Sequence, residues 1–273
     1  MRNKLKESKR IVIKVGTSTL TYENGSINLT RIEKLSRVIS DICNMGKEVV
    51  LVSSGAIGVG VGKLRIDKKP ESIREKQAVA AVGQCALMHI YNKFFGEYSH
   101  VVAQVLLTRD VLENERMKNN VCNTFDTLLE KGIIPIVNEN DAISIDEIQN
   151  ILNFGDNDNL SAIVATLVKA DTLIILSDID GFYDSDPREN KDSKMLKEVY
   201  DITPEIEECA GGAGSNRGTG GMITKLSAAK VSTKEGIDMI LANGEKPEIL
   251  IDILNGENIG TMFVANNGGV ENE

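Results

Sequence analysis

The chain has 273 residues, of which 41% are hydrophobic and 26% charged, and its formal net charge is −9. This length allows one large domain or two small ones, and the composition is that of an ordinary globular protein, which excludes general disorder. The negative charge argues against a nucleic-acid-binding or anionic membrane surface. No apolar run approaches the roughly 18 residues of a membrane span. We therefore expect neither a nucleic-acid partner nor a membrane partner.

Cysteine and histidine usage points to a reducing compartment. The four cysteines are far apart and form no C-x-x-C pair, and the two histidines lack a nearby ligand-like partner. Free thiols in the cytosol are the simplest interpretation, and a zinc site is disfavoured. The basic N-terminus is followed by Lys14 and then GTST, which is not the apolar core of a signal peptide. We expect a cytoplasmic location.

Short apolar runs alternate with helix-length stretches along the chain. Strands are predicted at Ile11–Val15, Glu48–Ser53, Val101–Leu107, Ile133–Asn138, Thr172–Ser177, Asp238–Leu241 and Thr261–Val264. Helices are predicted at Leu29–Met45, Glu75–Phe95, Glu115–Lys131, Asn159–Lys169 and Met222–Gly236. Strands that are apolar at consecutive positions are covered on both faces. The alternation predicts a mostly parallel sheet between two layers of helices, an α/β three-layer αβα sandwich.

Two lysines stand where a positive charge needs an explanation. Lys14 lies in the first strand, and a buried lysine is costly without a counter-charge. Lys225 is predicted in the first turn of a helix, where a cation opposes the helix dipole. A bound phosphate would explain both placements. The alternatives are an edge-strand position for Lys14 and a solvent-facing Lys225.

The glycine-rich segment Ser53–Lys63 follows the second strand but matches neither common nucleotide motif. Ile57 and Leu64 break the Walker A pattern, and the even spacing of the glycines breaks the Rossmann pattern. A glycine-rich turn after a parallel strand can still present backbone N–H groups to an anion. The alternative is the start of a closely packed helix.

Polar motifs follow later strands. NENDA covers 138–142, directly after a strand, and GDNDNLSA covers 155–162, at the start of a helix. One hypothesis is that Asp158 orients lysines or Mg²⁺ while Asn138, Asp141 and Asn157 bind a polar zwitterion. The alternative is that Asp158 or Asn159 only caps the helix. SDIDGFYDSDP (177–187) is consistent with a turn-rich loop.

Six segments together resemble the amino acid kinase family and, within it, the glutamate 5-kinases in the form without a C-terminal PUA domain. They are IVIKVGTSTLT (11–21), VSSGAIGVG (52–60), NENDA (138–142), FGDNDNLSA (154–162), SDIDGFY (177–183) and GTGGMITKL (218–226). The resemblance implies one kinase domain over residues 10–265, an N-terminal extension over 1–9 and a disordered tail over 266–273.

The resemblance also implies an activity: ATP-dependent phosphorylation of the γ-carboxylate of L-glutamate to glutamyl 5-phosphate, the first step of proline biosynthesis. It implies ATP and Mg²⁺ as cofactors, proline as a feedback inhibitor, and a homo-oligomer, either a dimer or a tetramer.

Site residues are carried over on the matching positions. The resemblance implies catalytic roles for Lys14, Lys225 and Asp158, and glutamate binding by Ser54, Asn138, Asp141 and Asn157. The implied nucleotide-binding residues are Lys14, Ser177, Asp178, Thr219, Gly220, Gly221, Met222, Ile223, Thr224 and Lys225. Magnesium would be carried mainly by ATP, with Asp156 as a further candidate ligand.

Three other functions remain as alternatives. N-acetylglutamate phosphorylation is one, although an N-acetyl substrate has no ammonium group for Asp141 to bind. A non-catalytic sensor is another, but such a chain could have lost the lysines or the GGM loop, and both are present. RNA binding is the third, and the net charge of −9 counts against it.

Overall fold

The computed structural model describes residues 2–22, 26–66, 68, 70–108, 110–143, 157–187, 190–211 and 220–266. Within these residues eight strands form one sheet in the order β3-β4-β2-β1-β5-β7-β8-β6. Their bounds are β1 Arg10–Val15, β2 Glu48–Ser53, β3 Val102–Leu107, β4 Ile134–Glu139, β5 Thr172–Ser177, β6 Glu198–Val199, β7 Asp238–Asn243 and β8 Thr261–Phe263. Neighbouring strands pair in parallel except β7 and β8, which are antiparallel.

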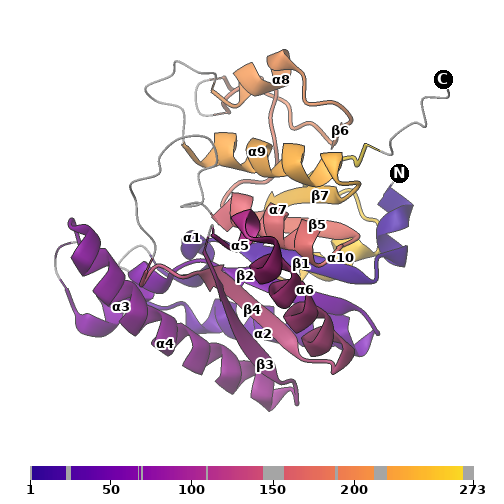
Figure 1. The fold of residues 1–273 in the computed structure, drawn as a ribbon. Helices are drawn as coiled ribbons and strands as arrows, with labels where there is room; N and C mark the ends of the chain where they lie inside the picture. Colours follow the sequence, from indigo (N-terminus) through magenta and orange to yellow (C-terminus); the bar gives the residue numbers. More distant parts are fainter. Residues whose placement is uncertain are drawn as a thin grey trace.

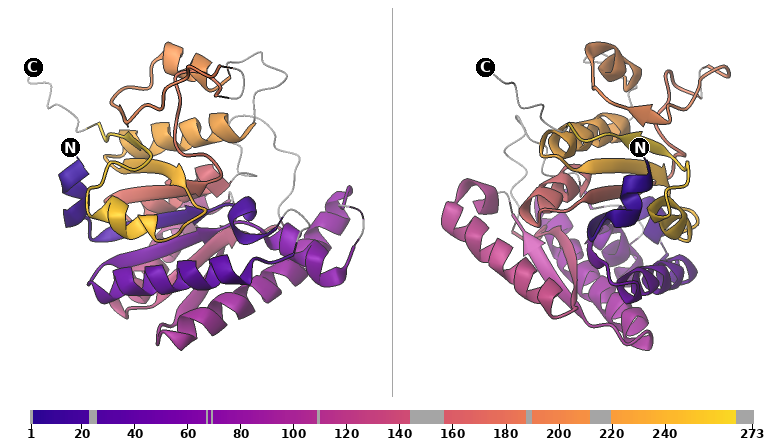
Figure 2. Two further views of the ribbon diagram at one scale, coloured as in Figure 1. Left: turned by 180° about the vertical axis from the view of Figure 1, so that it is seen from behind. Right: turned by 90° about the vertical axis from the view of Figure 1, so that its right-hand side faces the viewer.

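Helices cover both faces of the sheet (Figures 1 and 2). The longer ones are α2 Leu29–Asn44, α4 Ile73–Glu97, α6 Glu115–Glu130, α7 Asn157–Leu167 and α9 Gly220–Lys234. The shorter ones are η1 Arg2–Glu7, α1 Thr17–Leu20, α3 Ala56–Leu64, α5 Asp110–Glu113, α8 Pro204–Cys209 and α10 Ile249–Leu254. One apolar core lies between the sheet and α2, α4 and α10, and another lies between the sheet and α6, α7 and α9. The predicted three-layer αβα sandwich is confirmed.

In the described part of the chain, no helix is both long and apolar enough to cross a membrane.

The alternation of side chains along β1 places Lys14. Ile11, Ile13 and Val15 belong to the core on the α2 side, whereas Val12 belongs to the core on the α7 side. Because successive side chains of a strand point to opposite faces, Lys14 shares the face of Val12. β1 pairs with β2 on one side and β5 on the other, and Lys14 is only 6% exposed. The edge-strand alternative for Lys14 is therefore wrong.

The glycine-rich segment after β2 forms a helix, α3, as the close-packing interpretation predicts, and anion binding at its N-terminus stays a prediction. Gly55 caps it with φ +99°, a left-handed conformation that favours glycine. Gly60 and Gly83 bring α3 and α4 into close contact, since a Cβ on Gly83 would lie 1.8 Å from the backbone oxygen of Ala56. The glycines here serve helix packing as well as the turn.

Three helices begin two residues earlier than predicted. α4 begins at Ile73, α7 at Asn157 and α9 at Gly220. As a result Asp158 lies inside the first turn of α7, and Lys225 lies in the second turn of α9. Lys225 is 9% exposed, so the solvent-facing alternative for this lysine is wrong.

The first residues of the chain pack on the domain. The Arg2 guanidinium donates to the backbone oxygens of Lys197, Glu257, Ile259 and Gly260. These bonds tie η1 to the residue before β6 and to the segment before β8. The predicted tail lies outside the described residues from position 267 onward.

Candidate active site

A buried carboxylate between two lysines forms the centre of the site. Lys14 Nζ lies 2.5 Å from Asp158 Oδ1, and Lys225 Nζ lies 3.0 Å from Asp158 Oδ2. Asp158 is 1% exposed. Burial by itself raises the pKa of Asp158, but the charges of Lys14 and Lys225 outweigh it and hold that pKa below its ordinary value. The carboxylate is therefore ionised, and the three side chains together carry one net positive charge.

Three elements bring these side chains together. Lys14 comes from β1, and α7 packs against both β1 and α9. The first turn of α7 supplies Asp158, and the second turn of α9 supplies Lys225, whose Nζ also donates to the oxygen of Gly221 at 2.9 Å. Thr224 Oγ1 donates to Asp158 Oδ2 at 3.1 Å. The counter-charge that the sequence required for Lys14 is thus Asp158.

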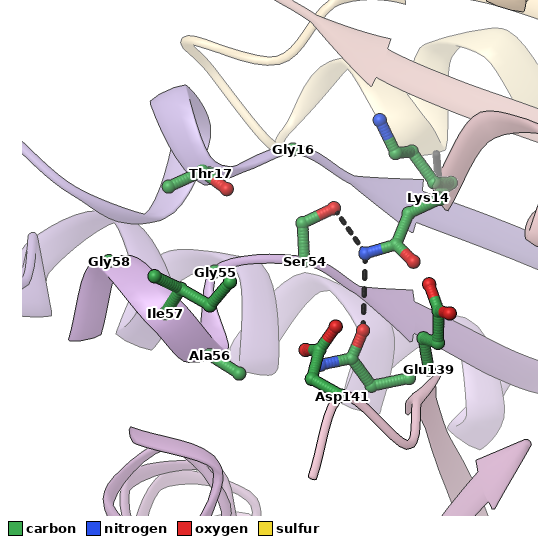
Figure 3. A pocket seen from close by; sticks show the side chains of 12 residues that line it. Lys14, Gly16, Thr17, Ser54, Gly55, Ala56, Ile57, Gly58, Glu139 and Asp141 are labelled. Atoms are coloured by element: carbon green, nitrogen blue, oxygen red, sulfur yellow. Dashed lines mark hydrogen bonds between the residues drawn. The ribbon is translucent and has the colours of Figure 1, made fainter. Parts of the chain in front are cut away.

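A cavity of about 350 Å³ opens beside Lys14. It is lined by Lys14, Gly16, Thr17, Ser54, Gly55, Ala56, Ile57, Gly58, Asn138, Glu139, Asp141 and Asn157. These residues follow or end β1, β2 and β4, or begin α3 and α7. The carboxyl ends of neighbouring parallel strands are the usual position of ligand sites in α/β sheets. Figure 3 shows Lys14, Ser54 and Asp141 around this cavity.

Hydrogen bonds join three of the predicted glutamate-binding residues. Asn157 Nδ2 donates to Ser54 Oγ at 2.7 Å and to Asn138 Oδ1 at 3.1 Å. Asn138 is 2% exposed. The structure thus brings Ser54, Asn138, Asp141 and Asn157 to one cavity, although β2, β4 and α7 are far apart in sequence.

The cavity has two kinds of charge. Asp141 and Glu139 supply carboxylates, which attract a cation such as an ammonium group. Lys14 and the N-terminus of the nine-residue helix α3 supply positive charge, which attracts anions. A ligand that carries an ammonium group and more than one anionic group is chemically complementary to this arrangement.

The predicted nucleotide-binding residues lie around the carboxyl end of β5 and the start of α9. Ser177 ends β5, the strand beside β1, and its Oγ donates to Asp178 Oδ1 at 3.0 Å. On α9, Met222 packs partly into the core, whereas Ile223 is 46% exposed. Thr219 and Asp156 lie outside the described residues.

Magnesium binding by the protein finds little support in the side chains that the structure describes. No group of three or more aspartate, glutamate, histidine or cysteine residues among them could hold a metal ion. Both oxygens of Asp158 face lysines. Mg²⁺ commonly binds through substrate phosphates and only one or two carboxylates.

Several lining residues were not singled out in the sequence. Glu139 lies between Asn138 and Asp141, so the same NENDA motif could have identified it. Thr17 follows Gly16 in the turn after β1 and belongs to the first motif. Ile57 and Gly58 belong to the glycine-rich segment for which anion binding is one prediction, but only the first turn of α3 reaches the cavity.

The fold and the site define an α/β protein that gathers two lysines and a helix N-terminus at the carboxyl edge of a parallel sheet, an arrangement suited to anionic ligands. The amino acid kinase family matches residues 9–243. The chain belongs to the amino acid kinase family.

The chain is similar to known proteins in sequence and in structure. The chain is 92% identical over 268 residues to a glutamate 5-kinase of Clostridium perfringens, covering 98% of this chain and all of that protein. It is 61% identical to a glutamate 5-kinase of Listeria monocytogenes, covering 97% of this chain and 96% of the relative. Among solved structures, a carbamate kinase from Giardia lamblia bound to AMP-PNP superposes with a TM-score of 0.68 at 18% identity, covering 96% of this chain and all of the other. A UMP kinase from Bacillus anthracis gives a TM-score of 0.63 at 18% identity, over 95% of this chain and 97% of the other. The two structural likenesses show the fold.

Proposed function

We propose that this protein transfers the γ-phosphoryl group of ATP to the side-chain carboxylate of L-glutamate and forms glutamyl 5-phosphate. The observation that carries the proposal is the position of the Lys14–Asp158–Lys225 cluster beside a cavity with both carboxylate and cationic walls. The 92% identity to a protein named glutamate 5-kinase supports the choice of substrate. The product places the reaction at the entry to proline biosynthesis.

The nucleophile needs no general base in this mechanism. A glutamate side chain has an ordinary pKa of about 4.3, so it is already ionised at neutral pH. One carboxylate oxygen attacks the γ-phosphorus as the bond to the β-phosphate oxygen breaks, and ADP leaves. The barrier comes from bringing an anionic nucleophile to a polyanionic phosphate. Positioning and charge stabilisation therefore account for most of the catalysis.

The two lysines supply that stabilisation. Lys14 lies in the cavity wall, so we assign it to the side of the transferred phosphoryl group that faces glutamate. Lys225 comes from α9, beside the predicted nucleotide-binding residues, so we assign it to the nucleotide side. Asp158 holds both ammonium groups in place, so their charges are positioned before the substrates arrive. Loss of one such donor commonly costs about 3–4 kcal/mol, or about 10²–10³ in rate.

Glutamate recognition follows from the two charged walls of the cavity. We assign the substrate ammonium group to Asp141, with Glu139 nearby, and the α-carboxylate to Ser54 and the N-terminus of α3. The side-chain carboxylate then extends toward Lys14. The lining supports this orientation because each charged group of glutamate meets a group of opposite charge or a hydrogen-bond donor.

Magnesium is proposed to enter with ATP, bound to its phosphates. Its charge would offset part of the negative charge of the triphosphate. Asp156, outside the described residues, remains a predicted ligand.

Proline is proposed to inhibit by competing for the cavity. It carries an ammonium group and a carboxylate, so the same Asp141 side and the α3 N-terminus can hold it, although it lacks a carboxylate to react. Activity measured over a range of proline at several glutamate concentrations tests this. We expect glutamate to relieve the inhibition, and inhibition that saturating glutamate leaves unchanged would exclude competition.

The experiment that tests the proposed function is a coupled assay of ADP release with MgATP and a panel of acceptors. The panel contains L-glutamate, N-acetyl-L-glutamate, L-aspartate, carbamate and UMP at matched concentrations. We expect glutamate to have the highest kcat/KM, because Asp141 and Glu139 favour a free ammonium group. A kcat/KM for N-acetylglutamate equal to or above that for glutamate would contradict the assignment.

A further inference from the structure

Gln84, on α4, lies outside the cavity described above but is bonded to it. Its side chain is buried, with 8% of the residue exposed. Gln84 Oε1 accepts a hydrogen bond from Asn138 Nδ2 at 2.9 Å, and Asn138 Oδ1 accepts from Asn157 Nδ2. Asn157 donates in turn to Ser54 Oγ. Three amides and one hydroxyl thus form a continuous chain that ends in the cavity.

This chain has a direction, because an amide has a donor end and an acceptor end. Gln84 Oε1 takes a hydrogen from Asn138, which turns the Asn138 oxygen toward Asn157. Both amide hydrogens of Asn157 are then used, one by Asn138 and one by Ser54. Any bond from the Asn157 side chain to a ligand therefore uses its oxygen. The Ser54 hydroxyl, which accepts from Asn157, keeps its own hydrogen to donate.

The resulting polarity suits an amino acid. An acceptor oxygen on Asn157 can receive a hydrogen from an ammonium group, and the Ser54 hydroxyl can donate to a carboxylate. If Asn138 turned over, its Nδ2 would face the Nδ2 of Asn157, and two donors would oppose each other. The Gln84 oxygen is what holds Asn138 in the orientation that avoids this clash.

Packing alone does not account for a glutamine at this position. Among the described residues Gln84 Nε2 has no hydrogen-bond partner, although it is buried. An unpaired buried donor is unfavourable, so an apolar side chain of the same length would pack at lower cost. The amide is useful here because of the bond that its oxygen makes to Asn138.

We propose that Gln84 is a positioning residue for glutamate binding, which acts by fixing the orientation of the Asn138 and Asn157 amides. This inference rests on the proposed function, since it names the residue that sets the polarity of the same cavity. Gln84 does not itself line the cavity, and it reaches the cavity only through its hydrogen bond to Asn138. Its influence is therefore expected on KM for the acceptor acid rather than on kcat or on KM for ATP.

The test compares two substitutions of opposite kind. Gln84→Met keeps the length of the side chain and removes the acceptor. Gln84→Glu keeps an acceptor oxygen and introduces a buried acidic group. Gln104→Met is the matched control, since Gln104 is an exposed glutamine on β3 that lines a neighbouring hollow with Gln84. Steady-state kinetics for glutamate and ATP and a thermal melt are measured for each.

For Gln84→Met we expect KM for glutamate to rise about three- to tenfold, the usual effect of losing one neutral hydrogen bond. KM for ATP and kcat should stay within twofold. Gln84→Glu should keep KM for glutamate within threefold of the wild type, even if its melting temperature falls, and Gln104→Met should match the wild type. A purely structural role gives the reverse order, with Met tolerated and Glu impaired.

The proposal is overturned if Gln84→Met has the wild-type KM for glutamate, or if KM rises equally for glutamate and ATP. Gln84→Leu carries the same test if the methionine variant does not fold. The variants are compared on whichever acid of the panel the wild-type protein phosphorylates. The two possible errors therefore give different results. A wrong substrate shows in the acceptor preference of the wild-type protein, and a wrong role for Gln84 shows in the KM of each variant relative to the wild type.

Discussion

The residue that organises the candidate active site is Asp158, which neutralises one of two buried lysine charges. The trio retains one positive charge at the place where phosphate charge is proposed to arrive. A fully neutralised cluster would attract a phosphoryl group less, and two lysines without a carboxylate would repel each other in a buried site. Asp158 thus offsets the cost of burying Lys14 and still leaves one positive charge for the proposed phosphate.

Lys225→Met is expected to lower kcat about 10²–10³-fold, because it removes one of the two positioned charges. The fold should persist, since Lys14 still pairs with Asp158. Lys230→Met is the matched control: this lysine lies on the same helix, is exposed, and pairs with Glu207 on the surface. ADP release and a melting curve measure both variants. A Lys225→Met variant with near-normal turnover would remove Lys225 from the mechanism.

Asp158→Asn is expected to reduce the free energy of unfolding at pH 7 by about 3–5 kcal/mol, the usual cost of leaving buried charges without their partner. The lysines hold the folded-state pKa of Asp158 below its unfolded value of about 3.9. The contribution of Asp158 is therefore fully present above that value and is lost as pH falls through the folded-state pKa.

Urea unfolding of the wild type and Asp158→Asn at several pH values measures this difference. It should be constant from pH 7 to about pH 5 and shrink only below about pH 4. A difference that already closes between pH 7 and pH 5 would mean that burial, and not the lysines, controls the pKa of Asp158.

Asp141→Asn is expected to raise KM for glutamate at least tenfold while KM for ATP changes less than twofold. The substitution keeps the size of the side chain and removes the charge that we assign to the substrate ammonium group, and hydrogen bonds to charged groups are worth about 1.5–3 kcal/mol. Asp41→Asn, at an exposed position on α2, is the control. Equal increases in both KM values would show that Asp141 is not a glutamate ligand.

At the scale of elements, the contact between α3 and α4 sets the geometry of the cavity. Gly83 of α4 lies against the backbone of Ala56, and Gly60 of α3 lies against the backbone of Val79. Side chains at these glycines would push the helices apart. Because the first turn of α3 lines the cavity and Gln84 follows Gly83, this contact positions both.

Gly83→Ala is expected to destabilise the protein by about 1–3 kcal/mol, because the new Cβ meets backbone atoms that cannot move aside easily. KM for glutamate should also rise as α3 shifts. Gly96→Ala is the control in the same helix: nothing lies within 4 Å of its Cβ position, and alanine favours helix. Thermal unfolding compares the two. A Gly83→Ala variant that is as stable as Gly96→Ala would show that the close contact is not needed.

The sequence predicted the sheet well because its strands are continuous apolar runs. β2 and β5 were placed with their observed ends, and α6 differs from its prediction by one residue. The strand β6, with only two residues, and the short helices α1, α5, α8 and α10 carry too few residues for a periodic signal. Glycine spacing alone does not decide the helical state of Ala56–Leu64, because it fits both a turn and a close helix contact.

Site residues that belong to a sequence motif could be predicted. Ion pairs and hydrogen bonds between segments far apart in sequence could not. The need for a counter-charge at Lys14 follows from strand burial, but its pairing with Asp158 depends on the packing of α7 against β1. Gln84 has no motif signal, since its role comes from a hydrogen bond to a residue 54 positions away. Bonds of this kind become visible only when the helices are placed.

At the scale of the whole molecule, a net charge of −9 accompanies a site proposed for two anionic substrates. The positive charge is local. Lys14 of the sheet, Lys225 of helix α9 and the N-terminus of α3 meet at the carboxyl edge of the sheet. The overall charge therefore argues against nucleic-acid surfaces without arguing against ATP. The parallel order of β1, β2, β4 and β5 makes this convergence possible.

Trapping of the product with hydroxylamine shows whether the phosphoryl group is transferred to the side chain of glutamate. An acyl phosphate reacts with hydroxylamine to give a hydroxamate and inorganic phosphate. Hydrolysis of ATP by water gives inorganic phosphate but no hydroxamate. With MgATP, L-glutamate and hydroxylamine, we expect one γ-glutamyl hydroxamate for each ADP formed, and no hydroxamate without glutamate. Release of ADP without hydroxamate would contradict transfer to the glutamate side chain.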